Sequence, residues 1–247
     1  FTDIAPLEAV DELDVSYVSN ISQFGDPDVV IIPGSKNTIS DLLWMRQNGL
    51  EGKILRHAAK GGIVFGICGG YQMLGQSISD PTGAEQKGTV RGMGLLPVTT
   101  VFEQEKRRTR VSGRFAKVGG ALAEMSGVCY EGYEIHMGRT VLSKGTVPLV
   151  YMEEEGEQRQ DGAQSDHVYG CYMHGIFDMS ETVKTFLAAV LRKKGIDPSK
   201  ITVRDRNAYK EEQYDRLASI VRENLNMEAV YKIIEKGNEA SCSLLSE

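Results

Sequence analysis

Residues 63–75 read IVFGICGGYQMLG, and this stretch decides the fold of the chain. An apolar run leads to Gly66, Cys68 follows, and two further glycines open a helix-like pattern. This is the layout of a nucleophile elbow, G-x-S-x-G, with cysteine in place of serine. Because such a turn is strained and crowded, it needs residues without a Cβ on both sides of the nucleophile. The stretch therefore predicts a buried strand, a sharp turn that presents Cys68, and a helix that leaves the turn.

The predicted elbow gives Cys68 the setting of a nucleophile. The amides and the dipole at the start of the helix favour the thiolate, which is the reactive form of cysteine. The amide of Gly69 is in position to donate to an oxyanion. The alternative is a buried, unreactive cysteine in a glycine-rich turn, but the surrounding glycines after a strand favour catalysis.

Composition limits the possible partners. The 247 residues carry a formal net charge of −6, which argues against a nucleic-acid or anionic-membrane surface. No apolar run approaches the ~20 residues that span a bilayer, and the opening residues do not resemble a signal peptide. The four cysteines are widely spaced, so we expect no zinc site, no disulfide framework and a reducing compartment, the cytoplasm.

A second strand and loop precede the elbow. Residues 28–32 are rich in β-branched side chains and predict a buried parallel strand that ends at Pro33-Gly34. Helical patterns follow at residues 39–47 and 51–60, and alternation of strands and helices is typical of a doubly wound α/β sheet. The loop 33–38 and the elbow would then meet at the carboxyl edge of the sheet. Amides near Gly34 and Ser35 could complete an oxyanion hole; a phosphate cradle or a plain turn are the alternatives.

The remaining chain shows further patterns. Alternating or β-branched residues predict strands at 15–18, 115–118 and 130–137, and the polar stretch 153–166 predicts a long exposed loop. The basic cluster Lys106–Arg110 indicates either a solvated edge strand or a docking surface. Helical patterns at 206–224 and 227–236 predict a C-terminal helical extension with a frayed tail over 201–247, after a main domain of 1–200.

His174 is the candidate base. It ends the strand-like segment of YGCYMHGIFD, residues 169–178, and the chain turns at Gly175 before a helix. A histidine at a strand end is more often structural when it stands alone. Paired with an elbow cysteine it predicts a nucleophile and base.

These motifs resemble one family. The elbow, the loop IIPGSKNTISDLLWMR, the segment YEIHMGRT (133–140), YGCYMHGIFD, the opening FTDIAPL and the stretch RGMGLLPVTTVF are similar to class I glutamine amidotransferases, and within them to the glutaminase domains of cobyric acid synthases. The resemblance implies a flavodoxin-like, mostly parallel sheet flanked by helices, with an antiparallel extension. It also implies that glutamine is hydrolysed through a Cys68 thioester with His174 as base.

The resemblance implies further residue roles and partners. Gln72 matches a position that contacts substrate glutamine, and Glu134 and His136 lie in a segment that lines the glutamine site; exposed or structural roles are the alternatives. An ATP-dependent synthetase domain, with ATP, magnesium and a corrinoid acceptor, is expected upstream, because this chain contains no P-loop. No cofactor is expected in the present domain.

One position departs from the wider class. Many class I enzymes carry H-x-E, but Ile176 stands where the glutamate is expected. We therefore expect a Cys68–His174 dyad whose histidine is oriented by a backbone carbonyl or water, with Glu134 as a further possibility. Other hypotheses are a glutaminase that feeds a cell-wall (lipid II) amidating ligase, a cysteine hydrolase on the same fold, and a non-catalytic binding module.

Overall fold

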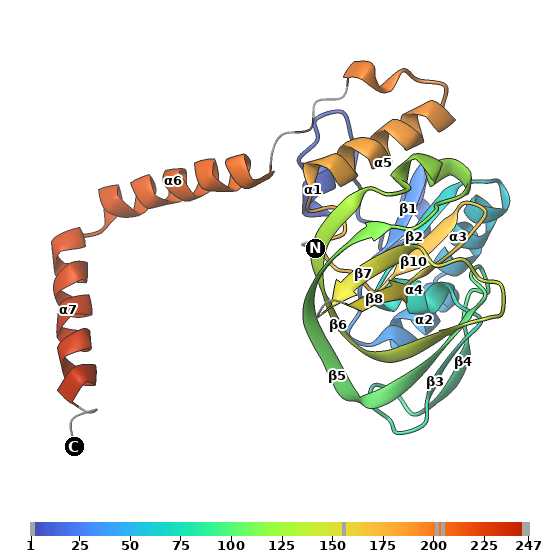
Figure 1. Ribbon diagram of the computed structural model, residues 1–247, viewed down its shortest axis with the longest axis horizontal. Coiled ribbons are helices and arrows are strands. Elements are labelled where there is room, and N and C mark those ends of the chain that lie inside the picture. Colours follow the sequence, from blue (N-terminus) through green and yellow to red (C-terminus); the bar gives the residue numbers. More distant parts are fainter. Residues whose placement is uncertain (1–2, 155–156, 201–202, 204–205, 244–247) are drawn as a thin grey trace. The chain divides into compact units, whose positions relative to one another are not determined.

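The computed structural model describes residues 3–154, 157–200, 203 and 206–243 (Figure 1). Internal contacts divide the chain into two compact units, Phe1–Val203 and Arg204–Glu247. The second unit contains the helices α6 (Arg206–Asn224) and α7 (Met227–Ser243). Part of the expected frayed tail, residues 244–247, lies outside the described residues.

A four-stranded sheet forms the centre of the first unit, in the order β1-β2-β10-β9. Its strands are β1 (Val29–Ile32), β2 (Ile63–Ile67), β10 (Val168–Cys171) and β9 (Ala163–Ser165). The first three run parallel, and β9 pairs antiparallel with β10 at the edge. Every residue of β2 is buried, as expected for the middle of a parallel sheet whose faces are both covered.

Helices cover this sheet. They are α1 (Ala5–Glu8), α2 (Thr38–Gln47), α3 (Leu50–Ala59), α4 (Gly69–Leu74) and α5 (Ser180–Lys193), with short 3-10 turns η1 (Ile21–Gln23), η2 (Gly120–Met125) and η3 (Pro198–Lys200). Phe177 joins α5 to the sheet, because its ring lies 5.6 Å from that of Phe65 in β2 and 5.0 Å from that of Phe186 in α5. The predicted α/β fold is confirmed.

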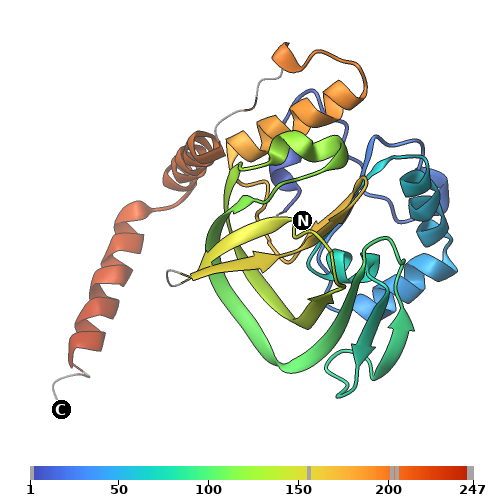
Figure 2. The same ribbon diagram turned by 45° about the vertical axis from the view of Figure 1, so that its right-hand side comes forward.

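A second, six-stranded sheet forms the antiparallel extension. Its strands are β3 (Ser77–Asp80), β4 (Gly88–Arg91), β5 (Val98–Phe115), β6 (Cys129–Leu142), β7 (Val150–Glu154) and β8 (Glu157–Asp161). β5 and β6 form a long, curved antiparallel ribbon, visible in Figures 1 and 2, whose register shifts between Phe102 and Arg107. The β3–β5 pair is parallel, whereas the other ladders of this sheet are antiparallel.

Three local predictions are wrong. Residues 15–18 form no strand; Val15 packs against the core from an irregular segment, and Tyr17 is 51% exposed. The strand expected at 115–118 is instead the end of β5, which stops at Phe115. The loop expected at 153–166 contains β8 and β9, whose polar residues suit edge strands with one face in water.

The elbow and the end of β1 approach each other closely at Gly70. A Cβ on Gly70 would lie 2.0 Å from the carbonyl oxygen of Ile32 and 2.9 Å from that of Pro33. Those atoms belong to the backbone and cannot give way as a side chain does. The contact between the loop after β1 and α4 therefore requires glycine at this position.

We predict that Gly70→Ala destabilises the protein by several kcal/mol, because the backbone of β1 or α4 would have to move. Gly52→Ala, a glycine inside α3 whose Cβ would meet only Arg56 at 3.7 Å, is the matched control. It should raise stability by up to about 1 kcal/mol. Chemical denaturation measures both changes, and equal effects of the two substitutions would contradict the prediction.

Candidate active site

Cys68 lies at the turn between β2 and α4 in a strained backbone conformation. Its φ of 51° and ψ of −108° lie outside the regions that ordinary residues prefer. The turn is held because the amide of Cys68 donates to the carbonyl of Cys171 over 2.9 Å. The side chain is only 6% exposed, and its Sγ lies 3.7 Å from the carbonyl oxygen of Ile135 in β6.

The loop after β1 lies directly against this turn. A Cβ on Gly69 would be 2.8 Å from the amide nitrogen of Ser35, and one on Gly34 would be 3.7 Å from Cβ of Cys68. The backbone of Gly34 and Ser35 thus reaches Cys68 and Gly69, as the sequence predicts for an oxyanion hole. Within the described chain, the amides of these three residues (34, 35 and 69) donate to no other group.

His174 follows β10 and faces both Cys68 and Gly34. A Cβ on Gly34 would lie 2.7 Å from Cε1 of His174 and 3.7 Å from Cβ of Cys68, so the imidazole lies beside the Cys68 side chain. Its backbone forms an isolated antiparallel bridge with Tyr133 of β6, with N–O distances of 2.9 and 3.1 Å. The Tyr133 ring stacks on the imidazole at 5.1 Å and 15°. Tyr133 therefore holds His174 through both its backbone and its ring.

Asp3 orients the imidazole. Nδ1 of His174 lies 2.8 Å from Oδ2 of Asp3, and Oδ1 of Asp3 accepts from the amide of Gly175 over 2.7 Å. The expected dyad with a backbone or water acceptor is therefore wrong, because a carboxylate contacts the ring. This carboxylate, Asp3, lies near the start of the domain sequence, far from His174 along the chain. Ile176, at the position where many class I enzymes carry the glutamate of H-x-E, is buried in the core.

The charges around His174 favour its imidazolium form. Burial alone would lower the pKa of His174, but the hydrogen bond that it donates to Asp3, the neighbouring Cys68 and the charges of both raise the pKa to about 9. Burial likewise opposes ionisation of Asp3, yet the hydrogen bonds to His174 and Gly175 lower its pKa.

Gln72 lies in α4 one turn beyond the nucleophile, and its side chain is 2% exposed. Its Oε1 lies 3.2 Å from Oγ1 of Thr38, and its Nε2 donates to the hydroxyl of Tyr172 over 3.1 Å. It is not the exposed helix residue that we considered as the alternative. A direct contact of Gln72 with glutamine stays a prediction.

Glu134 and His136 lie in β6, and the His136 ring stacks on that of Tyr172 at 3.7 Å. The carboxylate of Glu134 is fully buried and pairs with Arg159 at 2.5 Å and with Arg107 at 2.9 Å. Burial would raise the pKa of Glu134, but the hydrogen bonds from His136 and Arg159 lower it to about 2. Nδ1 of His136 lies 2.8 Å from the carbonyl of Gly138. Both side chains are engaged internally, so their contact with glutamine also stays a prediction.

The sequence indicated none of the roles of Asp3, Tyr133 or Glu85. Asp3 and Tyr133 do lie in stretches that carry the family resemblance, and this was the available signal for them. Glu85 lies in the loop between β3 and β4, and its Oε2 accepts from the amide of Thr38 over 2.6 Å. No local pattern reveals that contact, because it joins residues 47 positions apart.

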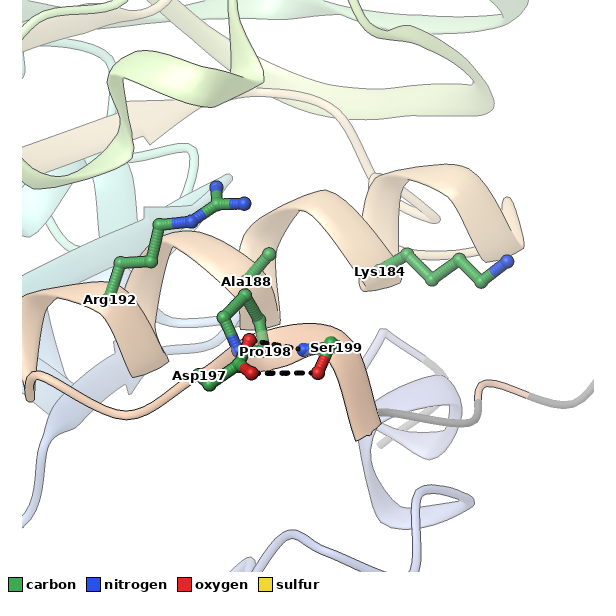
Figure 3. A pocket seen from close by; sticks show the side chains of 6 residues that line it. All are labelled: Lys184, Ala188, Arg192, Asp197, Pro198 and Ser199. Carbon is green, nitrogen blue, oxygen red and sulfur yellow. Dashed lines mark hydrogen bonds between the residues drawn. The ribbon is translucent and has the colours of Figure 1, made fainter.

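A pocket elsewhere in the described chain is separate from this site. A shallow pocket of about 280 Å³ between α5 and η3 is lined by Lys184, Ala188, Arg192, Asp197, Pro198 and Ser199 (Figure 3). None of these residues belongs to the cysteine–histidine site, and the Asp197 carboxylate already bonds Ser199. Among the described residues no cluster of His, Cys, Asp and Glu could hold a metal ion, and none of their helices could span a membrane.

The fold is that of class I glutamine amidotransferases. A solved glutamine amidotransferase superposes with a TM-score of 0.51 over 78% of this chain and 91% of the other, at 14% sequence identity. This likeness concerns the fold alone.

Sequence comparisons give the family. The model of the CobB/CobQ-like glutamine amidotransferase domain matches residues 1–182. The chain therefore belongs to this family of enzymes. It is 51% identical over 243 residues to a cobyric acid synthase of Ruminiclostridium cellulolyticum and 42% identical over 247 residues to one of Lachnoclostridium phytofermentans. These alignments cover 97% and 96% of this chain but only 47% and 48% of the relatives, so the chain spans about half their length.

We predict that Asp3→Asn lowers the pKa of His174 from about 9 by one unit or more, because the substitution removes the adjacent negative charge. Titration of the imidazole Cε1–H signal by NMR measures this. The folded-state pKa of His174 lies above the usual 6.5. The stabilisation that the charged imidazole gives to the fold is therefore complete below pH 6.5 and is lost as the pH rises through 9. Asp166→Asn, an exposed turn carboxylate, is the control. An unchanged His174 midpoint in Asp3→Asn would refute the role of Asp3.

Proposed function

We propose that this chain is the glutaminase part of a cobyric acid synthase. It would hydrolyse glutamine and supply ammonia for ATP-dependent amidation of corrinoid carboxylates in cobalamin biosynthesis. The observation that carries the proposal is the contact of Cys68 with His174 and of His174 with Asp3, in a chain of this family. The two relatives, of which this chain covers about half, are named cobyric acid synthases, and this name supports a corrinoid as the acceptor of ammonia.

In the proposed reaction, the Cys68 thiolate attacks the side-chain amide carbon of glutamine, and the carbonyl electrons move onto oxygen. The amides of Gly69 and of Gly34 or Ser35 donate to that oxyanion. Their lack of other acceptors and their closeness to Cys68 support this role. The imidazolium of His174 then protonates the departing nitrogen, the C–N bond breaks, and ammonia leaves a thioester on Cys68.

Water completes the proposed cycle. His174, now neutral, removes a proton from water as the water attacks the thioester, and a second oxyanion forms at the same amides. The C–S bond then breaks, which releases glutamate and restores the thiolate–imidazolium pair. Asp3 keeps Nδ1 of His174 protonated and its Nε2 directed at the reacting atoms throughout. We further propose that Gln72, Glu134 and His136 shape the glutamine site.

The relatives have about as many further residues outside the aligned region, and these residues suggest the partner that we propose. We propose a synthetase domain in the same polypeptide, which holds ATP, magnesium and the corrinoid, and a cytoplasmic location for the whole protein. The proposed domain limits are 1–200 for the glutaminase and 201–247 for a helical extension. Within the basic cluster Lys106–Arg110, Arg107 forms an ion pair with the buried Glu134. Arg108 and Arg110 are exposed, and they lie on the sheet face that also carries Tyr133.

We predict that Cys68→Ala abolishes glutamine hydrolysis without loss of the fold, because no other group can form the thioester. An electrophilic glutamine analogue should label Cys68 before Cys129, although Cys129 is exposed and Cys68 is buried. Peptide mapping by mass spectrometry and circular dichroism measure the two results. Cys129→Ala is the control and should retain activity. Labelling of Cys129 or Cys171 together with an active Cys68→Ala protein would refute the assignment.

We predict weak glutaminase activity for residues 1–247 alone and about tenfold stimulation by the synthetase domain with its substrates, a typical allosteric coupling. If Arg108 and Arg110 contribute to docking, their double reversal to Glu should reduce the stimulation. Reversal of Arg56 and Lys60, exposed near the end of α3, matches the charge change at another surface. If the synthetase domain stimulates both double variants equally, the basic cluster has no docking role and is only a solvated part of the strand.

A further inference from the structure

The loop between β3 and β4 is rigidly organised by one carboxylate. Asp80, the last residue of β3, accepts four backbone hydrogen bonds over 2.8 to 2.9 Å, from the amides of residues 83, 84, 85 and 86. These amides lower the pKa of Asp80, although burial acts in the opposite direction. The backbone of Glu85 is therefore fixed, and its side chain projects from a defined position.

Glu85 reaches from this loop to the first turn of α2. Its Oε2 accepts from the amide of Thr38 over 2.6 Å, and its Oε1 lies 3.4 Å from the Thr38 hydroxyl. The ordinary N-cap of α2 is Asn37, which accepts from Ser40, so Glu85 satisfies a further amide of this helix end. Burial raises the pKa of Glu85, because the half-buried carboxylate is partly removed from water.

Thr38 in turn contacts the elbow. Thr38 is 1% exposed, and its Oγ1 lies 3.2 Å from Oε1 of Gln72. A Cβ on Gly69 would lie 3.1 Å from Oγ1 of Thr38. The backbone that precedes Thr38 carries the Gly34 and Ser35 amides. A continuous set of contacts therefore runs from Asp80 through Glu85 and Thr38 to the residue after the nucleophile.

We propose that Glu85 is a positioning residue for glutamine hydrolysis: its carboxylate fixes the start of α2, and thereby the 33–38 loop, against the Cys68 elbow. The inference rests on the proposed function and adds a residue to it. Donors to an oxyanion act only when they are held in place before the charge develops. Loss of Glu85 should therefore affect the transition state more than the binding of glutamine.

The test compares three substitutions in the full-length natural polypeptide. Glu85→Ala should lower kcat at least tenfold with KM changed less than threefold. Glu85→Gln keeps an oxygen acceptor for the Thr38 amide and should restore most of kcat. Gln86→Ala is the matched control, because Gln86 lies in the same loop and bonds the Ser40 hydroxyl of the same helix without touching Thr38. It should behave as wild type.

Two results would overturn the inference. One is an unchanged kcat in Glu85→Ala. The other is a raised KM, equal in Glu85→Gln and Glu85→Ala, which would mean that the negative charge binds the ammonium group of the substrate instead.

An NMR measurement separates this inference from the proposed function. The amide signals of Gly34, Ser35 and Thr38 should shift or broaden in Glu85→Ala and stay in place in Gln86→Ala. If the wild-type polypeptide hydrolyses no glutamine, the proposed function fails, and these signals still report on Glu85. Unchanged signals in Glu85→Ala would overturn the positioning role.

Discussion

The structure depends on one close approach, the contact of the 33–38 loop with the start of α4. The carbonyl of Ile32 occupies the space that a side chain on residue 70 would need, and the amide of Ser35 occupies the space beside Gly69. Beside this contact, Cys68 has a positive φ and its buried side chain lies next to His174. The strain at a single residue is therefore offset by packing between two strand ends.

Carboxylates around this contact have separate tasks. Asp3 faces the imidazole, and Glu85 faces the start of α2. Glu134 neutralises arginines inside the β5–β8 sheet, and Asp161 accepts from the amide of Tyr172 over 2.8 Å. Each acid is bound to a different donor. Of these four acids, Asp3 is the one that contacts His174, and it raises the pKa of the histidine.

Sequence patterns were informative where the signal is local. The elbow, the parallel strands and the pairing of Cys68 with His174 follow from short motifs whose backbone requirements are strict. Asp3 could not be found in this way, because a hydrogen bond over 171 positions leaves no periodicity. The length of β5 was missed for a different reason. Its basic residues indicate an exposed segment, yet Arg107 turns inward to a buried partner that lies on another strand.

The distance in sequence between Asp3 and His174 also bears on when the site is assembled during folding. Contacts between remote segments form late, after the loops between them have closed. A partly folded chain that already contains the β2 turn therefore lacks the acidic partner that keeps the histidine charged. In such a chain the imidazole lacks the carboxylate that raises its pKa in the folded protein. The arrangement of Cys68, His174 and Asp3 is thus complete only when the first residues of the domain have docked.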